Sequence, residues 1–159
     1  MGGRATCLNG AVTPADASVP PATLLYVVKQ LELVSRAQLD ELLRPAGVTT
    51  LQYTALTVLA RRPHMTSADL ARLSFVRAQS TADLVSALAK RELISRSPDP
   101  ANRRRLLISL TDAGRELLAT YDPLVAQLEE QMLADFSPSE RDDFRELLGR
   151  ARRSLTPVP

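Results

Sequence analysis

Apolar residues recur every three or four positions along most of this chain, which is the spacing of one buried helix face. The first such helix is expected to begin at Pro21, because proline suits the first position of a helix, and to end at Pro45 and Gly47. Its apolar face is formed by Leu24, Val27, Val28, Leu31, Val34, Leu39 and Leu42. Residues 1–20 show no such periodicity and are expected to form a flexible tail.

Three shorter helical patterns follow before residue 92. Thr49 precedes a glutamine by three residues and Thr66 precedes an aspartate by three, which is the spacing of a capping box at a helix start. The third of these helices is expected to begin between Gln79 and Thr81. A short helix, a tight turn and a longer helix are typical of a helix-turn-helix, whose second helix enters the major groove of DNA.

The pattern then changes from helix to strand. Residues 93–97 and 105–111 are short runs rich in Ile and Leu, and the turn-forming stretch PDPAN joins them. This pattern predicts a two-stranded hairpin with an exposed tip. A hairpin directly after a helix-turn-helix is a wing, so the predicted fold is mainly α with a small β-hairpin wing: a winged helix-turn-helix.

Two more helices are expected after the hairpin. The first covers residues 111–136, where Pro123 should introduce a kink or a break. The second begins at Ser137, where Pro138 at the first helical position and Glu140 complete a strong start signal.

The distribution of charge is more informative than the net charge of +2. Between Arg61 and Arg105 there are ten basic and four acidic residues, so the rest of the chain is acidic overall. A basic centre of this kind indicates a polyanionic partner. Arg104 is expected to enter the minor groove, whose negative potential attracts a guanidinium, and Arg103 to bind a phosphate. Since neighbouring strand residues point to opposite faces, Arg105 faces either the hairpin or a neighbouring carboxylate.

The composition disfavours several classes of protein. No segment approaches the roughly 18 apolar residues of a membrane helix, and the first residues lack the apolar run of a secretory signal. Cys7 is the single cysteine, so neither an internal disulfide nor a cysteine zinc cluster is expected, and a reducing cytoplasm is the expected compartment. One histidine and six glycines leave little material for an active site, so no catalytic residues, metal site or cofactor are expected.

The stretch RELISRSPDPANRRRLLISLTDAGREL resembles the wing region of the MarR (multiple antibiotic resistance regulator) family of bacterial transcription factors, and the order of the surrounding helices matches. The resemblance covers about residues 21–155. It implies a homodimer that binds double-stranded DNA at palindromic operators, usually as a repressor. It also implies a small aromatic or lipophilic effector that releases the homodimer from the DNA. It also implies helical dimerisation arms at residues 21–48 and 112–155 and a DNA-binding winged helix-turn-helix at residues 49–111.

Three positions depart from the family pattern. Asn102 stands where the family has a wing-tip aspartate, so an ion pair that would orient the arginine becomes a hydrogen bond at best. Asp83 stands where relatives often have a basic or polar DNA-contacting residue; it either repels phosphate, caps the helix with Ser80 or pairs with a wing arginine. Glu92 replaces the usual glycine before the first strand, which leaves the shape of that turn open.

Two sets of candidate site residues result. The DNA-binding candidates are wing arginines and the first turn of the recognition helix, where free N–H groups also face phosphate: Arg77, Gln79, Ser80, Thr81, Arg103 and Arg104. The effector-binding candidates, for which core packing is the alternative, are Tyr26, Tyr53, His64 and Phe75. The alternative function is a winged-helix module that binds another protein without specific DNA binding.

Overall fold

The computed structural model describes residues 21–74 and 78–155. The predicted tail with Cys7, and the candidates Phe75 and Arg77, lie outside the described residues. The chain divides into two compact units, Met1–Val34 and Ser35–Pro159, and the first helix runs from one into the other.

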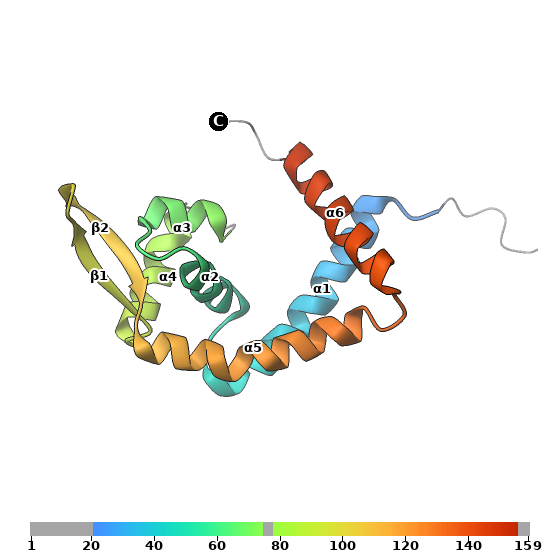
Figure 1. The fold of residues 1–159 in the computed structure, drawn as a ribbon, viewed down its shortest axis with the longest axis horizontal. Helices are drawn as coiled ribbons and strands as arrows, with labels where there is room; N and C mark the ends of the chain where they lie inside the picture. Colours follow the sequence, from blue (N-terminus) through green and yellow to red (C-terminus); the bar gives the residue numbers. More distant parts are fainter. Residues whose placement is uncertain (1–20, 75–77, 156–159) are drawn as a thin grey trace, which may run out of the picture. The chain divides into compact units, whose positions relative to one another are not determined.

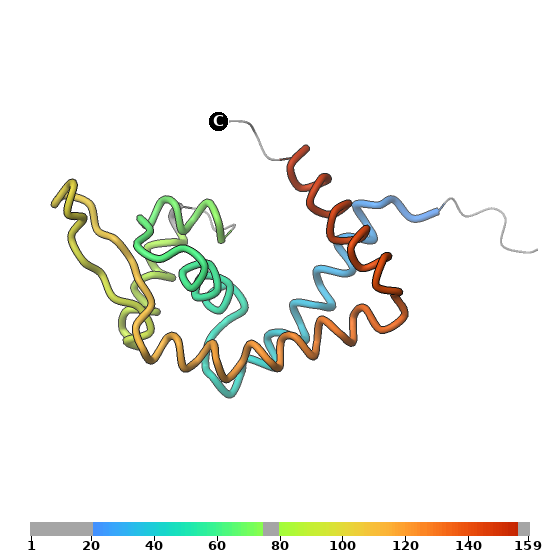
Figure 2. The backbone as a smooth tube through the Cα atoms, in the orientation of Figure 1, coloured from blue at the N-terminus to red at the C-terminus, as the bar shows by residue number. Residues whose placement is uncertain are grey.

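The described chain is mostly helical with one antiparallel hairpin, as the sequence predicted (Figure 1). The elements, in chain order, are α1 (Leu24–Leu43), a 3₁₀ turn η1 (Arg44–Ala46), α2 (Thr50–Arg61), α3 (Ser67–Leu73), α4 (Ala78–Lys90), β1 (Ile94–Asp99), β2 (Asn102–Leu110), α5 (Asp112–Met132) and α6 (Pro138–Leu155). The backbone trace in Figure 2 shows α2, α3 and α4 gathered beside the hairpin. Among the described residues, no helix is both long and apolar enough to cross a lipid bilayer.

One hydrophobic core in the second unit holds α2, α3, α4 and the hairpin together. Every one of these elements contributes at least one side chain to it, and α5 closes it with Leu118. The largest apolar side chains that are less than 2% exposed are Leu43, Leu56, Leu59, Leu70, Leu88 and Ile108. Leu56 and Leu59 lie three residues apart on α2, so helical spacing predicts their part of the core, whereas Leu43, Leu70, Leu88 and Ile108 come from four different elements.

The helix starts follow their capping residues. Thr49 and Gln52 form the predicted capping box at α2, with the Thr49 hydroxyl accepting from the Gln52 N–H and the Gln52 amide oxygen accepting from the Thr49 N–H. The Thr66 hydroxyl accepts from the Asp69 N–H at the start of α3. At α6, the Glu140 carboxylate accepts from both the N–H and the hydroxyl of Ser137, and these hydrogen bonds lower the pKa of Glu140.

Some helix bounds differ from the sequence prediction. Helix α1 begins at Leu24, three residues after Pro21, and α4 begins at Ala78, one residue before the predicted window. Of the kink or break predicted at Pro123, the break is not observed, because α5 continues through this residue. The missing N–H of Pro123 and the crowding of its ring against the preceding turn do not end this 21-residue helix.

The turn between α4 and the wing has the shape that a glycine would give. Glu92 lies in the left-handed region with φ of 57°, and its N–H donates to the Ala89 carbonyl at 2.9 Å. The Leu93 N–H donates to the Leu88 carbonyl at 3.1 Å, which completes a Schellman motif. The question left open at Glu92 is therefore answered: this residue adopts the left-handed conformation that a glycine would adopt without strain.

Arg91, next to this turn, joins the end of α4 to the turn between α1 and α2. Its guanidinium donates to the carbonyl oxygens of Gly47 at 2.5 Å and Ala46 at 2.6 Å. Gly47 ends η1 with φ of 63°, which a glycine adopts without strain. This bidentate contact fixes the end of α4 relative to the end of α1.

We expect Glu92→Gly to raise the free energy of unfolding by about 1 kcal/mol, because glycine removes the left-handed strain. Urea denaturation followed by circular dichroism measures the change. Glu92→Ala is the control and should give no such gain, since alanine keeps the strain. An equal gain in the free energy of unfolding in both variants would show that the glutamate side chain, not the left-handed backbone, destabilises the wild type.

We expect Gly114→Ala to lower the free energy of unfolding by about 2 kcal/mol. A Cβ at Gly114 would lie 2.2 Å from the Leu93 carbonyl oxygen, and backbone cannot move aside as a flexible side chain does. Gly149→Ala in α6 is the matched control, because the atom nearest its new Cβ is the end of the Arg153 side chain at 3.4 Å. The control should be neutral or slightly stabilising, and similar losses in both would contradict this assignment.

Candidate nucleic-acid interface and effector cavities

Helix α4 has one buried and one exposed face. Thr81, Val85 and Leu88 are buried, and they lie at helical spacing on the side that packs against the core. The opposite side carries short or charged side chains that are exposed to solvent: Ser80, Ala82, Asp83, Ser86 and Lys90. This outward face is the part of α4 that is available to a major groove.

The predicted contacts in the first turn of α4 are only partly available. Ser80 is exposed, as a DNA contact requires. Thr81 is only 3% exposed, so its hydroxyl lies inside the protein and the prediction that it contacts DNA needs correction. The backbone of Gln79 lies in α4, but its side chain is outside the described part of the chain, as is all of Arg77.

The wing is an antiparallel hairpin with an irregular tip. Ile94 pairs with Leu110 at its base and Asp99 with Asn102 at its tip, and the register shifts between Pro98 and Asp99. The Asp99 carboxylate accepts from the Ala101 N–H at 2.9 Å. These contacts hold the tip in one conformation.

Asn102 has a specific role at this tip. Its amide oxygen accepts from the backbone N–H of Arg104 at 3.1 Å. The asparagine therefore replaces an arginine–aspartate ion pair with a hydrogen bond to the arginine backbone. This contact orients the strand at Arg104 and leaves the Arg104 guanidinium unconstrained.

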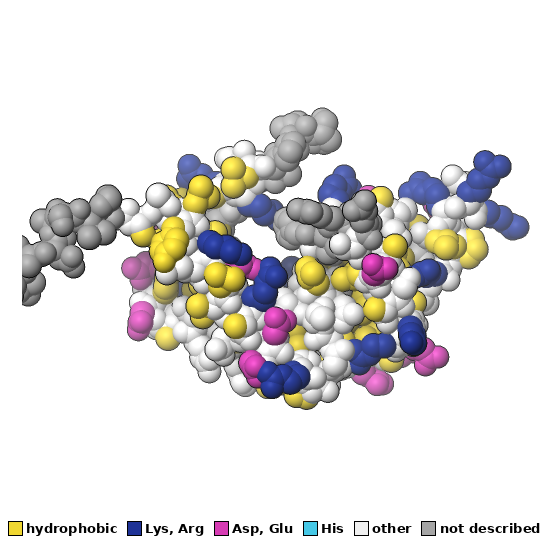
Figure 3. All heavy atoms as spheres, turned by 180° about the vertical axis from the view of Figure 1, so that it is seen from behind, with side chains coloured by type: hydrophobic (Ala, Val, Ile, Leu, Met, Phe, Trp, Pro, Cys, Tyr) yellow, Lys and Arg dark blue, Asp and Glu magenta, His cyan; other side chains and the backbone are white. Residues whose placement is uncertain are grey.

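The three wing arginines divide into two groups. Arg105 Nε lies 3.7 Å from Asp99 Oδ2, so of the two alternatives left open for Arg105 the structure favours the carboxylate. Arg103 and Arg104 are exposed and form no ion pair with any described residue. Basic side chains gather at the outer end of the hairpin (Figure 3).

The base of the wing is joined to the loop after α2. Met65 and Ile108 exchange backbone hydrogen bonds of 3.1 and 2.7 Å, so this loop pairs with β2. His64 turns the chain into this pairing with φ of 61°, and its Nδ1 lies 2.9 Å from the Ser109 hydroxyl oxygen. The histidine therefore helps to fix the wing relative to α2 and α3.

Asp83 pairs with none of its predicted partners. No hydrogen bond or ion pair joins its carboxylate to Ser80, to the wing arginines or to any other residue that the structure describes. Of the three alternatives, helix capping and pairing with the wing are therefore not observed. Asp83 is an exposed negative charge in the middle of the outward face of α4.

The predicted effector residues do not form one site. Tyr53 lines a cavity of about 520 Å³ between α2 and α5, together with Thr57, Leu118, Asp122 and Glu129. Its hydroxyl donates to the Asp122 carboxylate, and burial followed by this bond raises the pKa of Tyr53. Sequence analysis missed Asp122, whose only signal was its place on the buried-face edge of a long helix.

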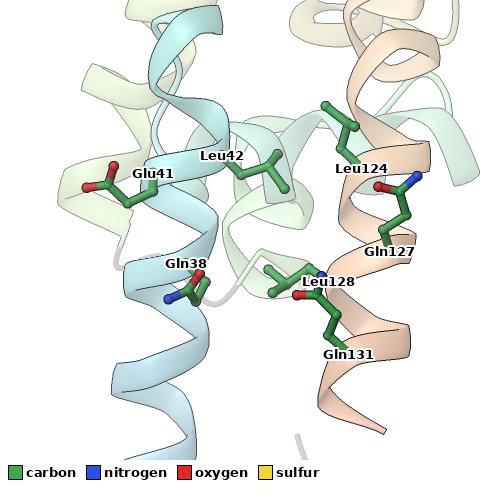
Figure 4. Close-up of a pocket in the computed structure, with 7 residues that line it drawn as sticks. All are labelled: Gln38, Glu41, Leu42, Leu124, Gln127, Leu128 and Gln131. Atoms are coloured by element: carbon green, nitrogen blue, oxygen red, sulfur yellow. The ribbon is translucent and has the colours of Figure 1, made fainter. Parts of the chain in front are cut away.

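His64 lines a separate cavity of about 290 Å³ at the base of the wing, with Leu59, Pro63, Ser109 and Arg115. A third, shallow groove of about 400 Å³ lies between the last turns of α1 and the C-terminal half of α5 (Figure 4). The leucines Leu42, Leu124 and Leu128 point into the space between the two helices, and the polar residues that line the groove are Gln38, Glu41, Gln127 and Gln131.

The remaining candidate, Tyr26, belongs to the first unit. Its side chain is 56% exposed, and its hydroxyl oxygen accepts from the Gln30 side chain at 3.1 Å. Among the described residues, no group of three or more His, Cys, Asp or Glu side chains is arranged to hold a metal ion.

Comparison with known proteins places this geometry in a family. Residues 46–105 match the model of the MarR family. The transcriptional repressor NicR of Pseudomonas putida is 30% identical over 94 residues, which are 59% of this chain and 60% of NicR. A solved structure of a probable transcriptional regulator from Pseudomonas aeruginosa is 32% identical with a TM-score of 0.71, covering 81% of this chain and 96% of that one.

A further solved structure contains nucleic acid. The transcriptional repressor CouR, bound to a 23-mer DNA duplex, is 25% identical with a TM-score of 0.75, covering 82% of this chain and 92% of CouR. The helix-turn-helix and wing occur here in the predicted order, and the matches extend well beyond them into the flanking helices. The chain therefore belongs to the MarR family of winged helix-turn-helix transcription regulators, which are DNA-binding proteins and not enzymes.

Proposed function

We propose that this protein is a transcriptional repressor that acts as a homodimer on a palindromic DNA operator. The α4 helix of each protomer lies in the major groove, and the wing places Arg104 in the adjacent minor groove with Arg103 on a phosphate. The observation that carries the proposal is the pair of exposed, unpaired guanidinium groups at a wing tip whose third arginine is held by Asp99.

Two comparisons support the DNA-binding part of the proposal. CouR, a similar protein at 25% identity, is bound to a DNA duplex in its solved structure. NicR, at 30% identity, is described as a repressor, which supports repression as the sign of regulation. The spacing of the two recognition helices in such a dimer would match successive turns of DNA, roughly 34 Å apart.

Exposed apolar side chains support the homodimer. In the first unit, Leu24 is 83% exposed and Leu25 is 76% exposed, although both lie on a regular helix. In the second unit, Leu147 and Leu155 on α6 are 57% and 78% exposed. Large exposed leucines on helices indicate a protein–protein interface, and a second copy of the chain is the simplest partner.

The cavity between α2 and α5 supports a small aromatic or lipophilic effector. It combines an aromatic ring from Tyr53 with apolar walls from Leu118 and Val125. Polar groups that fix orientation come from Thr57 and Asp122. An effector bound there would contact α2, which belongs to the DNA-binding region, and α5, which belongs to a proposed dimerisation arm, so it could change the separation of the recognition helices.

We expect Arg104→Ala to weaken operator binding by about 5- to 150-fold, which corresponds to roughly 1–3 kcal/mol. The loss of this guanidinium charge from the DNA interface should also reduce the slope of log K against log salt by about 1. Gel-shift or fluorescence anisotropy titrations at several salt concentrations measure both quantities.

Arg105→Ala is the matched control for this variant. It removes the same charge from the next residue, but the Arg105 guanidinium is engaged by Asp99, so the salt slope should stay close to that of the wild type. If Arg104→Ala binds the operator as tightly as the wild type, the minor-groove assignment is wrong. If no duplex from a random pool is enriched by the wild type, the protein-binding alternative is favoured instead.

We expect Leu147→Glu to raise the dimer dissociation constant by about 100-fold or more. A twofold interface loses the burial of this leucine twice, and each loss costs roughly 1.5–3 kcal/mol. Sedimentation velocity at micromolar protein measures the change, with the adjacent exposed Glu146→Gln as control. A wild-type monomer, or an unchanged dimer in Leu147→Glu, would contradict the use of this face.

A further inference from the structure

Among the side chains that the structure describes, the outward face of α4 carries very few groups that can read a base edge. Asp83 lies three residues after Ser80 and three before Ser86, so the three share one side of the helix. Ala82 offers only a methyl group, and Lys90 is the last residue of the helix. Among the described residues of the first two turns, Asp83 is therefore the longest and the only charged side chain on this face.

The Asp83 carboxylate is free to take an external partner. It makes no hydrogen bond or ion pair with any residue that the structure describes, and its described neighbours Ser80, Ala82 and Ser86 have short side chains. Because a deprotonated carboxylate only accepts hydrogen bonds, its partner must be a donor. DNA phosphates, which are anionic acceptors, repel it.

The major groove offers few donors to such a group. Guanine presents the acceptors O6 and N7, and thymine presents the acceptor O4. Adenine has an N6 donor, but the N7 acceptor next to it repels a carboxylate. Cytosine presents its N4 amino donor, which is the pairing that aspartate and glutamate make in the major groove.

We propose that Asp83 is a specificity-determining residue that accepts a hydrogen bond from the N4 amino group of one cytosine in each half-site of the operator. This inference rests on the proposed function, since it requires α4 to lie in the major groove. The carboxylate has a second effect, because its repulsion of phosphate weakens binding to every sequence that lacks the cytosine. Attraction to the cytosine and repulsion from the phosphate backbone both increase the difference in affinity between the operator and other DNA sequences.

The test compares wild type, Asp83→Ala and Asp83→Asn, with Ser86→Ala on the same face as control. Each purified protein first selects sequences from a pool of random duplexes. Dissociation constants are then measured at one physiological salt concentration for the selected operator, for the operator with the proposed C·G pair changed to T·A, and for unrelated duplex DNA. Thermal melts of the variants check folding.

The wild type should prefer C·G over T·A by about tenfold or more at one position of each half-site. Asp83→Ala should reduce this preference to nearly none while binding unrelated DNA several-fold more tightly. Asp83→Asn should shift the preference towards adenine, because an amide pairs with adenine N6 and N7. Ser86→Ala should keep the preference for cytosine.

Two results would overturn the inference and leave the proposed function intact. The first is selection of the same base at every position by wild type and both Asp83 variants. The second is equal weakening of operator and unrelated DNA in the variants, which would mean that Asp83 only supports the structure of α4. If the wild type selects no sequence at all, the proposed function fails, and this inference fails with it.

Discussion

The geometry of the DNA-binding region depends on one close backbone contact between the start of α5 and the turn after α4. The Thr111 hydroxyl donates to the Glu92 carbonyl at 2.6 Å, and the Thr111 N–H donates to the Leu93 carbonyl at 3.2 Å. Gly114 approaches the same carbonyl so closely that no side chain fits between. Because these contacts fix how the chain leaves α4 and returns from β2, they set the position of the wing relative to the recognition helix.

Two further contacts join this region to α2 and to the end of α1. The Met65–Ile108 backbone pair joins the loop after α2 to β2, so the wing is held at its base from both sides. Arg91 joins the end of α4 to the carbonyls of Ala46 and Gly47, at the end of α1. The recognition helix α4, the wing and the end of α1 are therefore connected by short polar contacts as well as by the core.

Ion pairs and hydrogen bonds determine which of the charged side chains near the wing remain available to a partner. Asp99 engages Arg105, whereas Asn102 binds the backbone of Arg104 and leaves its guanidinium exposed. On α3, the Thr66 hydroxyl chiefly lowers the pKa of Asp69, and the charges of Arg72 and Arg105 add to this effect. Asp69 and Asp99 are thus paired, whereas the carboxylates of Asp83 on α4 and Glu92 before β1 form no hydrogen bond or ion pair with any residue that the structure describes. This contrast gives a single acidic residue on the recognition helix its significance.

The sequence by itself determined the order of the elements, the capping boxes at Thr49 and Ser137 and the hairpin. These features depend on residues close in sequence, so periodicity and local hydrogen bonding are sufficient to predict them. Only the tertiary structure decided that Thr81 is buried and that Arg105 pairs with Asp99. It also separated Tyr53 and His64 into different cavities and brought Asp122 to the first of them. Each of these depends on how distant segments pack, and no local pattern encodes such packing.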